Sequence, residues 1–326
     1  MTSPVPFVEI WRGAFLECTH FGQAVVCDDS GQIVHAWGDP DAVVLPRSSA
    51  KMIQALPLIT SGAADAVGLT PKQLALSCAS HHGAAIHTET VNAWLGTLGL
   101  NDDDFRCGPQ DPSNRAAHEK LIRNNAAPCQ AHNECSGKHV GFLTLNKHLG
   151  AGAEYVDRDH PVQKACLDAF ERVTDQTSPG FGIDGCSAPN FACTLHGMAR
   201  AMAHYAASPA GSAETRLHEA MRLHPEMVAG EGGACTELMR AMDGKVAIKT
   251  GAEGYYVAIL PEKKMGVALK ITDGAGRGRD CAIAAILVKL GVLDPNHPAA
   301  RAVMNAPIVN RAGLQVGMVK PASALH

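Results

Sequence analysis

The stretch VLPRSSAKMIQALP, residues 44–57, places Ser48 three residues before Lys51 at the start of a run with helical periodicity. Residues three apart share one face of a helix, so a helix beginning near Ser48 would bring the serine hydroxyl within reach of the lysine amine. A lysine that loses its proton in an apolar setting can serve as the base for a serine nucleophile. A helix-start serine beside a lysine that extends to solvent is the alternative interpretation of a lone S-x-x-K pattern.

The patterns on either side of this stretch predict strands at both ends of the chain and helices between them. Short apolar runs separated by Gly and Asp turns predict two or three strands in the first forty residues. Strand patterns return in KVAIKTG, GYYVAIL and MGVALKIT, and a terminal hairpin is expected around Ala312–Gly313. The predicted helices lie at about 48–60, 70–80, 136–150, 161–173, 190–206, 213–224, 234–242 and 277–291.

This order of elements predicts an α/β (α+β) fold. One antiparallel sheet is expected from both chain ends, with helices packed on it and a helix-rich lobe inserted between them. The mostly helical stretch would run from about residue 48 to 242. Because the chain shows no linker, repeat or low-complexity segment, we expect a single catalytic unit over residues 1–326 with two lobes.

The composition favours a small-molecule partner. With 46% hydrophobic and 18% charged residues, the chain is able to bury a large core. A formal net charge of -4 provides no attraction for nucleic acid or anionic lipid, and no stretch approaches the roughly 18 apolar residues of a membrane span. The N-terminus shows no export signal, and eleven scattered cysteines are typical of reduced thiols, so a cytoplasmic location is expected.

Two further motifs share the chemistry of the opening stretch. SCASHHG carries Ser80, and KTGAEG carries Lys249 at the end of a predicted strand. An S-x-x-K motif, a second serine and K-T-G, in this order, form the signature set of serine β-lactamases and penicillin-binding proteins. Because Ser80 does not lie in an S-D-N motif, a literal β-lactamase is disfavoured.

A cysteine cluster forms the third candidate constellation. NECSGKH contains Cys135, Lys138 and His139, and GIDGCSAPN contains Asp184 and Cys186. Two thiolates with one or two nitrogen or oxygen ligands suit tetrahedral zinc. Buried, unreactive cysteines are the alternative, because neither stretch contains C-x-x-C and lysine must lose its proton to bind a metal.

Five motifs together, PRSSAKMIQ, SCASHHG, NECSGKH, GIDGCSAP and KTGAEGYY, resemble the rhizobial-type, or class 3, L-asparaginases. The resemblance covers about residues 6–290. It implies a fold related to serine β-lactamases and penicillin-binding proteins, hydrolysis of the side-chain amide of L-asparagine to L-aspartate and ammonia, a homodimer, and one zinc ion per chain near the active site.

The resemblance also implies a role for each motif residue. It pairs Ser48 with Lys51, and Ser80 with a distant lysine, for which we favour Lys249 over Lys263 and Lys264 because the latter two lie in a predicted turn. The remaining implied residues are the zinc ligands Cys135, Lys138 and Cys186 and the substrate-orienting residues Arg47, His139 and Asp184. Zinc is expected to position the substrate more than to activate water.

Two other functions remain open from the sequence. One is a penicillin-recognising serine hydrolase, either a β-lactamase or a peptidase, and the many thiols and the lack of an export signal count against it. The other is a non-catalytic sensor that binds an amino acid or a β-lactam on the same fold.

Overall fold

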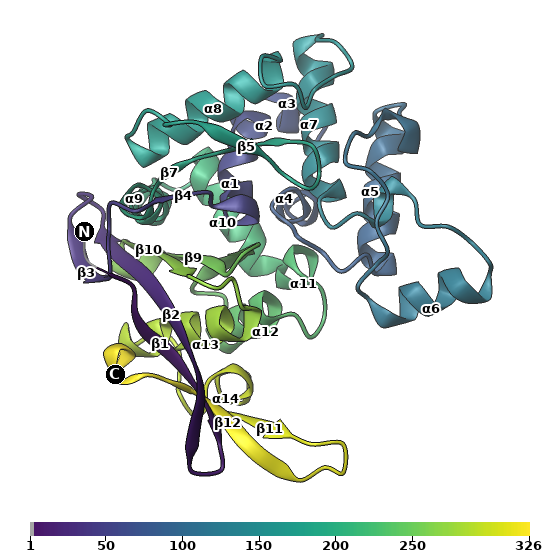
Figure 1. Ribbon diagram of the computed structural model, residues 1–326. Coiled ribbons are helices and arrows are strands. Elements are labelled where there is room, and N and C mark those ends of the chain that lie inside the picture. The colour runs from purple at the N-terminus through teal and green to yellow at the C-terminus, as the bar shows by residue number, and fades with distance from the viewer. Residues whose placement is uncertain (1–2) are drawn as a thin grey trace. The chain divides into compact units, whose positions relative to one another are not determined.

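The computed structural model describes residues 3–326, which divide into two compact units. The sheet unit comprises residues 3–49, 193–207 and 232–326, and the helical unit comprises residues 50–192 and 208–231. Figure 1 labels the helices and strands of both units. The helical lobe is expected from the sequence to run from about residue 48 to 242. Two parts of that stretch belong instead to the sheet unit, residues 193–207 and 232–242.

The sheet unit is built on eight antiparallel strands in the order β11-β12-β1-β2-β10-β9-β8, with β3 paired to β2. The strands are β1 (Val5–Arg12), β2 (Phe15–Asp28), β3 (Ile33–Trp37), β8 (Ala247–Gly251), β9 (Tyr255–Leu260), β10 (Met265–Ile271), β11 (Ala306–Val309) and β12 (Gln315–Pro321). Val8 of β1 lies opposite Pro321 of β12, so both chain ends share the sheet. The prediction of an antiparallel sheet built from both chain ends is therefore confirmed.

All six residues of β9 are buried, although their side chains point alternately to the two faces of the sheet. Both faces are therefore covered, and helices provide the cover. These helices are α9 (Leu195–Ala207), α12 (Ala234–Ala241), α13 (Gly276–Lys289) and α14 (Pro298–Val303). Gly266 permits β10 to lie close against α9, since a Cβ there would lie 2.1 Å from the backbone nitrogen of Ala203 in α9. The helix predicted from residue 190 begins at Leu195, because the residues before it form the short strands β6 (Pro189–Phe191) and β7 (Cys193–Thr194). β7 pairs with β4 (Val43–Val44).

The helical unit contains one small hairpin, β5 (Phe181–Ile183) with β6. Its helices are α1 (Lys51–Gln54), α2 (Leu56–Thr60), α3 (Ala63–Ala66), α4 (Pro71–Ser77), α5 (Ala85–Thr97), α6 (Arg115–Arg123), α7 (Ser136–Leu149), α8 (Pro161–Thr174), α10 (Ala213–Leu223) and α11 (Pro225–Val228). Ten consecutive residues of α7, 136–145, are buried. Gly137 lets the start of α7 touch the end of α4, because a Cβ there would lie 2.2 Å from the carbonyl oxygen of Leu76.

Local signals explain where several helices begin, break and end. Thr70 caps α4 in a reciprocal capping box with Gln73, and α7 ends at Gly150 in the left-handed conformation, which match the predicted start at residue 70 and the predicted end at residue 150. The predicted helix 48–60 is interrupted at Ala55, because Pro57 has no N–H to donate to Ile53. Helices α5 and α6 are absent from the sequence prediction.

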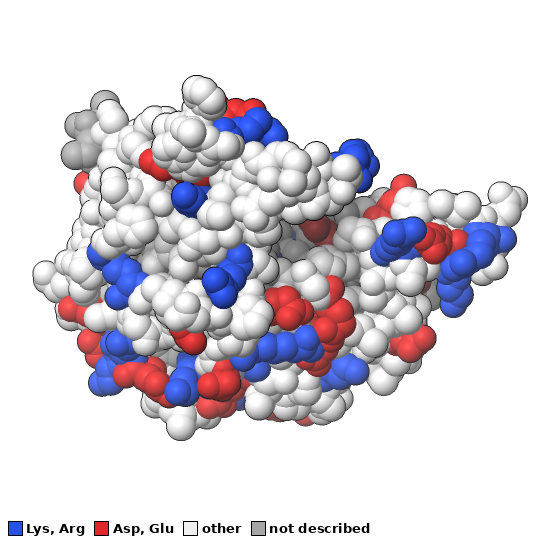
Figure 2. Space-filling model, turned by 90° about the horizontal axis from the view of Figure 1, so that it is seen from below, with Lys and Arg blue, Asp and Glu red and all other residues white. Residues whose placement is uncertain are grey.

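Charged side chains of both signs are mixed on one face of the molecule (Figure 2). Lys and Arg side chains are interspersed with Asp and Glu on the face shown in Figure 2, without a large area of one sign. Within residues 3–326, every helix is too short or too polar to cross a membrane.

Candidate functional site

Lys51 is the centre of a polar cluster in the helical unit. It is the first residue of α1 and its side chain is fully buried. Its Nζ atom donates hydrogen bonds to Ser80 Oγ at 3.0 Å, to Cys135 Sγ at 3.2 Å and to the carbonyl oxygen of Ala79. A buried amine is costly unless its hydrogen bonds are satisfied, and these three acceptors satisfy them.

Ser80 lies just beyond α4 in a loop held by backbone hydrogen bonds. Its own N–H donates to the carbonyl oxygen of Val228 at 2.9 Å, and the next N–H, of His81, donates to the carbonyl oxygen of Glu134 at 3.2 Å. The Ser80 residue is only partly buried, so the loop fixes its position without enclosing it completely. The sequence pairs Lys51 with Ser48, and within the helical unit Lys51 also contacts Ser80.

The three residues of the expected zinc set lie together in the helical unit. Lys138 Nζ donates to Cys186 Sγ at 3.1 Å. A hydrogen bond with Cys135 and the nearby Lys138 ammonium hold the pKa of the Cys186 thiol well below its usual value, while the same hydrogen bond and burial raise the pKa of Cys135 well above it. Burial acts to lower the pKa of Lys138, but the Cys186 and Cys135 sulfurs raise it overall. The lowered pKa of Cys186 and the raised pKa of Lys138 favour a charged pair, and the raised pKa of Cys135 favours its thiol form.

Two sulfurs and one amine at hydrogen-bonding distance form a donor set that fits zinc once Lys138 and Cys135 lose their protons. Conventional ligand residues alone do not make such a site: within residues 3–326, no group of three or more His, Cys, Asp or Glu side chains is arranged to hold a metal ion. A metal bound by this cluster would therefore need Lys138 as a ligand.

His139 and Asp184 border the sulfur cluster. His139 is fully buried, its Nδ1 atom lies 2.9 Å from the hydroxyl oxygen of Tyr155, and burial lowers its pKa despite the neighbouring Cys186 thiolate. Asp184 lies in the turn between β5 and β6 and contributes to raising the pKa of Lys138. Tyr155 has no local sequence signal, because it belongs to a loop outside every motif.

The sheet unit contains the other predicted residues. Arg47 adopts the left-handed conformation, with φ of 53°, and begins the short 3₁₀ helix Arg47–Ala50 that carries Ser48. This segment lies against the end of β8, because a Cβ on Gly251 would be 2.5 Å from the carbonyl oxygen of Pro46. Lys249 of β8 is fully buried and its Nζ atom donates to the carbonyl oxygen of Thr250 at 2.8 Å.

The two rival lysines differ from Lys249 in exposure. Lys263 and Lys264 are exposed between β9 and β10, and Lys264 lies 3.6 Å from Asp29. Their position agrees with the hairpin turn predicted from the sequence.

Neutral histidines surround the Ser80 loop. His81 stacks on His87 with ring centroids 4.7 Å apart, accepts the N–H of Gly83 at Nδ1 and lies 2.9 Å from Ser136 Oγ through Nε2. Burial lowers the pKa of His81 well below its usual value, with smaller contributions from His87 and Lys51, and burial also lowers the pKa of His82 and His87.

These lowered pKa values predict acid sensitivity. Below a pH of about 6.5 the unfolded chain binds protons that the buried histidines of the folded chain do not. The free energy of unfolding should therefore decrease as the pH is lowered from 7.5 to 5. Urea unfolding at both pH values measures the change. His87→Asn should flatten the dependence, whereas His148→Asn, at an exposed position, should not. Equal stability at pH 7.5 and 5 would contradict the prediction.

The family model for L-asparaginase II matches residues 8–321, nearly the whole chain. The chain belongs to this family, and the resemblance identified in the sequence is thereby confirmed. No curated protein matches the chain in sequence.

Solved structures with similar folds have low sequence identity to this chain. Mglu in its native form is 12% identical with a TM-score of 0.49, and the match covers 84% of this chain and 66% of Mglu. A putative β-lactamase from Bacteroides dorei is 12% identical with a TM-score of 0.41, covering 77% of this chain and 84% of its own. A β-lactamase from Mycobacterium bovis is 12% identical with a TM-score of 0.37, covering 82% and 94%.

Proposed function

We propose that this protein is an L-asparaginase, an amidohydrolase that converts L-asparagine to L-aspartate and ammonia through a serine-bound acyl intermediate. Membership of the L-asparaginase II family supports the substrate class. The observation that carries the proton relay is the hydrogen bond between Lys51 Nζ and Ser80 Oγ, because it joins a buried amine to a serine hydroxyl.

In this proposal Ser48 is the nucleophile and Lys51 is its base. The oxygen of Ser48 attacks the carboxamide carbon as Lys51, in its neutral form, takes the hydroxyl proton. Lys51 passes a proton to Ser80, which delivers it to the departing nitrogen, so that the C–N bond breaks and ammonia leaves. Water then attacks the ester, L-aspartate is released, and Ser48 regains its proton through the same groups.

Lys249 is the proposed second lysine, acting on Ser80. Its complete burial supports this choice over the exposed Lys263 and Lys264. For substrate binding, we propose that Arg47 attracts the α-carboxylate, whereas Asp184 attracts the α-ammonium group and His139 orients the bound amino acid.

We propose that Cys135, Lys138 and Cys186 hold one zinc ion per chain. The donor chemistry of this cluster supports the assignment. Bound to two thiolates and an amine, zinc would supply a fixed positive charge that shapes the pocket, with little Lewis acidity left for activating water.

The zinc assignment predicts the metal content of two variants. Cys135→Ala and Cys186→Ala should each lose the metal, measured by elemental analysis of purified protein, and should raise KM for asparagine more than they lower kcat. Cys166→Ala removes another buried cysteine of the helical unit and should retain about one zinc per chain. Full zinc content in both ligand variants would mean that the metal binds elsewhere.

A paired assay tests the proposed function. The purified protein should release ammonia from L-asparagine and leave a chromogenic cephalosporin intact. Cephalosporin hydrolysis without ammonia release would favour the penicillin-recognising hydrolase, and binding of either compound without turnover would favour the sensor.

We also propose a homodimer that works in the cytoplasm. All eleven cysteines are free thiols, as expected for a reducing compartment. Light scattering of the purified protein, which gives the mass in solution, tests the oligomeric state.

A further inference from the structure

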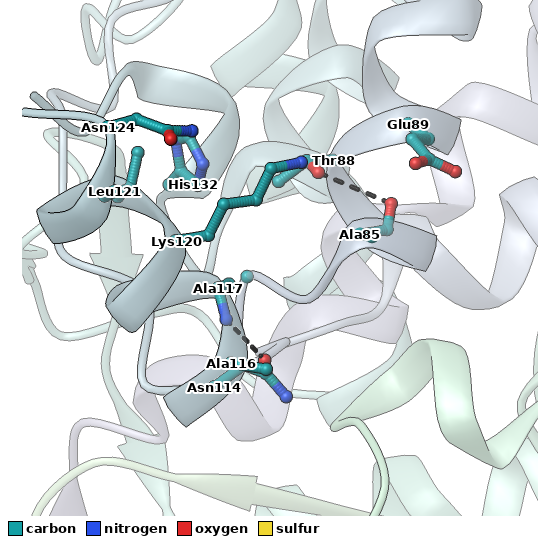
Figure 3. A pocket seen from close by; sticks show the side chains of 11 residues that line it. Ala85, Thr88, Glu89, Asn114, Ala116, Ala117, Lys120, Leu121, Asn124 and His132 are labelled. Carbon is teal, nitrogen blue, oxygen red and sulfur yellow. Dashed lines mark hydrogen bonds between the residues drawn. The ribbon is translucent and has the colours of Figure 1, made fainter. Parts of the chain in front are cut away.

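A cavity of about 410 Å³ lies in the helical unit between α5, α6 and the loop that follows Ser80 (Figure 3). Small or apolar residues form much of its wall: Gly83, Ala85, Ala116, Ala117 and Leu121. Its volume is within the range of small-molecule sites. Neither Ser80 nor Lys51 lines the cavity, so it is distinct from the cluster around Lys51.

Two opposite charges line this cavity without neutralising each other. Lys120 of α6 extends its amine across the cavity toward Thr88 of α5, and Glu89 lies on the same helix as Thr88 (Figure 3). Both Lys120 and Glu89 are exposed, and neither forms an ion pair with another residue in the range 3–326. A ligand with a carboxylate for Lys120 and an ammonium group for Glu89 would satisfy both.

Further hydrogen-bond donors around the cavity add a preference for negative charge. The Asn114 side-chain oxygen accepts the N–H of Ala117 at 3.0 Å, which leaves the amide nitrogen of Asn114 available to a ligand. His132 accepts the N–H of Cys129 at Nδ1, at 3.2 Å, so its Nε2 atom carries the proton and is a donor. Donors therefore outnumber the single carboxylate.

We propose that this cavity binds a free acidic α-amino acid. One ammonium group opposite Glu89 and two carboxylates among Lys120, His132 and Asn114 match the charges and donors around the cavity. A bound ligand would also contact the loop after Ser80, because Gly83 of that loop lines the cavity. The N–H of Asn114, another lining residue, donates to the carbonyl oxygen of His82 in the same loop at 2.8 Å. The inference concerns binding alone and does not depend on the proposed reaction.

Equilibrium dialysis with radiolabelled L-aspartate and L-glutamate tests the site. For at least one of the two amino acids, the wild-type protein should bind one molecule per chain more than Lys120→Met does. Glu89→Gln should weaken that binding at least tenfold. Lys164→Met, which removes an exposed lysine of α8, is the matched control and should bind as the wild type does. The test compares the number of bound molecules per chain in the wild type and in Lys120→Met. Binding of the amino acid at the proposed active site would add equally to both proteins and would not change this difference.

Two results would overturn the proposal. Equal stoichiometry and affinity in the wild type and Lys120→Met, for both amino acids, would exclude the cavity as their site. Displacement of the label from this site by succinate, which has no ammonium group, as readily as by L-aspartate would exclude the contact with Glu89. Thermal unfolding of each variant by circular dichroism checks that the fold is retained.

Discussion

Lys51→Met is expected to lower kcat for asparagine hydrolysis by at least about 1000-fold, because it removes the proposed base. Methionine fills a similar volume but leaves Ser80 Oγ, Cys135 Sγ and the carbonyl oxygen of Ala79 without their shared donor. Loss of these hydrogen bonds should cost about 1–3 kcal/mol of stability. Ammonia release measures the activity, and thermal unfolding by circular dichroism shows whether the variant folds.

Lys138→Met provides the matched comparison, because Lys138 is also a buried lysine of the helical unit that donates to a cysteine sulfur. It should lose zinc and raise KM with a much smaller effect on kcat. A folded Lys51→Met protein with more than a tenth of the wild-type kcat would remove Lys51 from the role of base. An equal loss of kcat in both variants would indicate that the whole cluster is needed for structure.

Local sequence signals were sufficient for much of the fold. Thr70, Pro71 and Gly150 mark helix ends through capping chemistry that acts within a few residues, and these ends lie at the start of the predicted helix 70–80 and at the end of the predicted helix 136–150. Helix α6 was not predicted, and none of its residues is buried. The strand at Pro189–Phe191 depends on pairing with Phe181–Ile183, which a pattern of helical period cannot reveal.

The candidate site was likewise predictable only in part, because its residues lie in local motifs whereas its contacts join distant parts of the chain. The sequence identified Lys51, Ser80 and the cysteine motifs, but it could not give their contacts. Lys51 reaches Ser80 across 29 residues of chain and Cys135 across 84. These contacts depend on the close approach of α4 and α7, which Gly137 permits by lacking a side chain. Sequence spacing favours Ser48 as a partner of Lys51, and the packing of the helices adds Ser80, which spacing cannot reveal.

Ser48→Ala should abolish measurable asparagine hydrolysis, a loss of at least about 1000-fold, while the protein stays folded. A hydroxyl at the start of a helix contributes at most about 1–2 kcal/mol of capping stability. Ser49→Ala is the matched control, because Ser49 is adjacent, lies in the same 3₁₀ helix and is also buried. It should retain most of the activity.

The contact between Lys51 and Ser80 makes Ser80 the rival nucleophile, and the position of the acyl group distinguishes the two serines. Acid quenching during turnover, followed by peptide mass spectrometry, should find the aspartyl ester on the peptide that contains Ser48. The ester should persist in Ser49→Ala and be missing in Ser48→Ala. In Ser80→Ala the ester should still form, at a reduced rate, because Ser80 only relays the proton to the leaving nitrogen. An ester on Ser80 would instead make Ser80 and Lys51 the nucleophile and base, and Ser48 would then be a substrate-positioning residue.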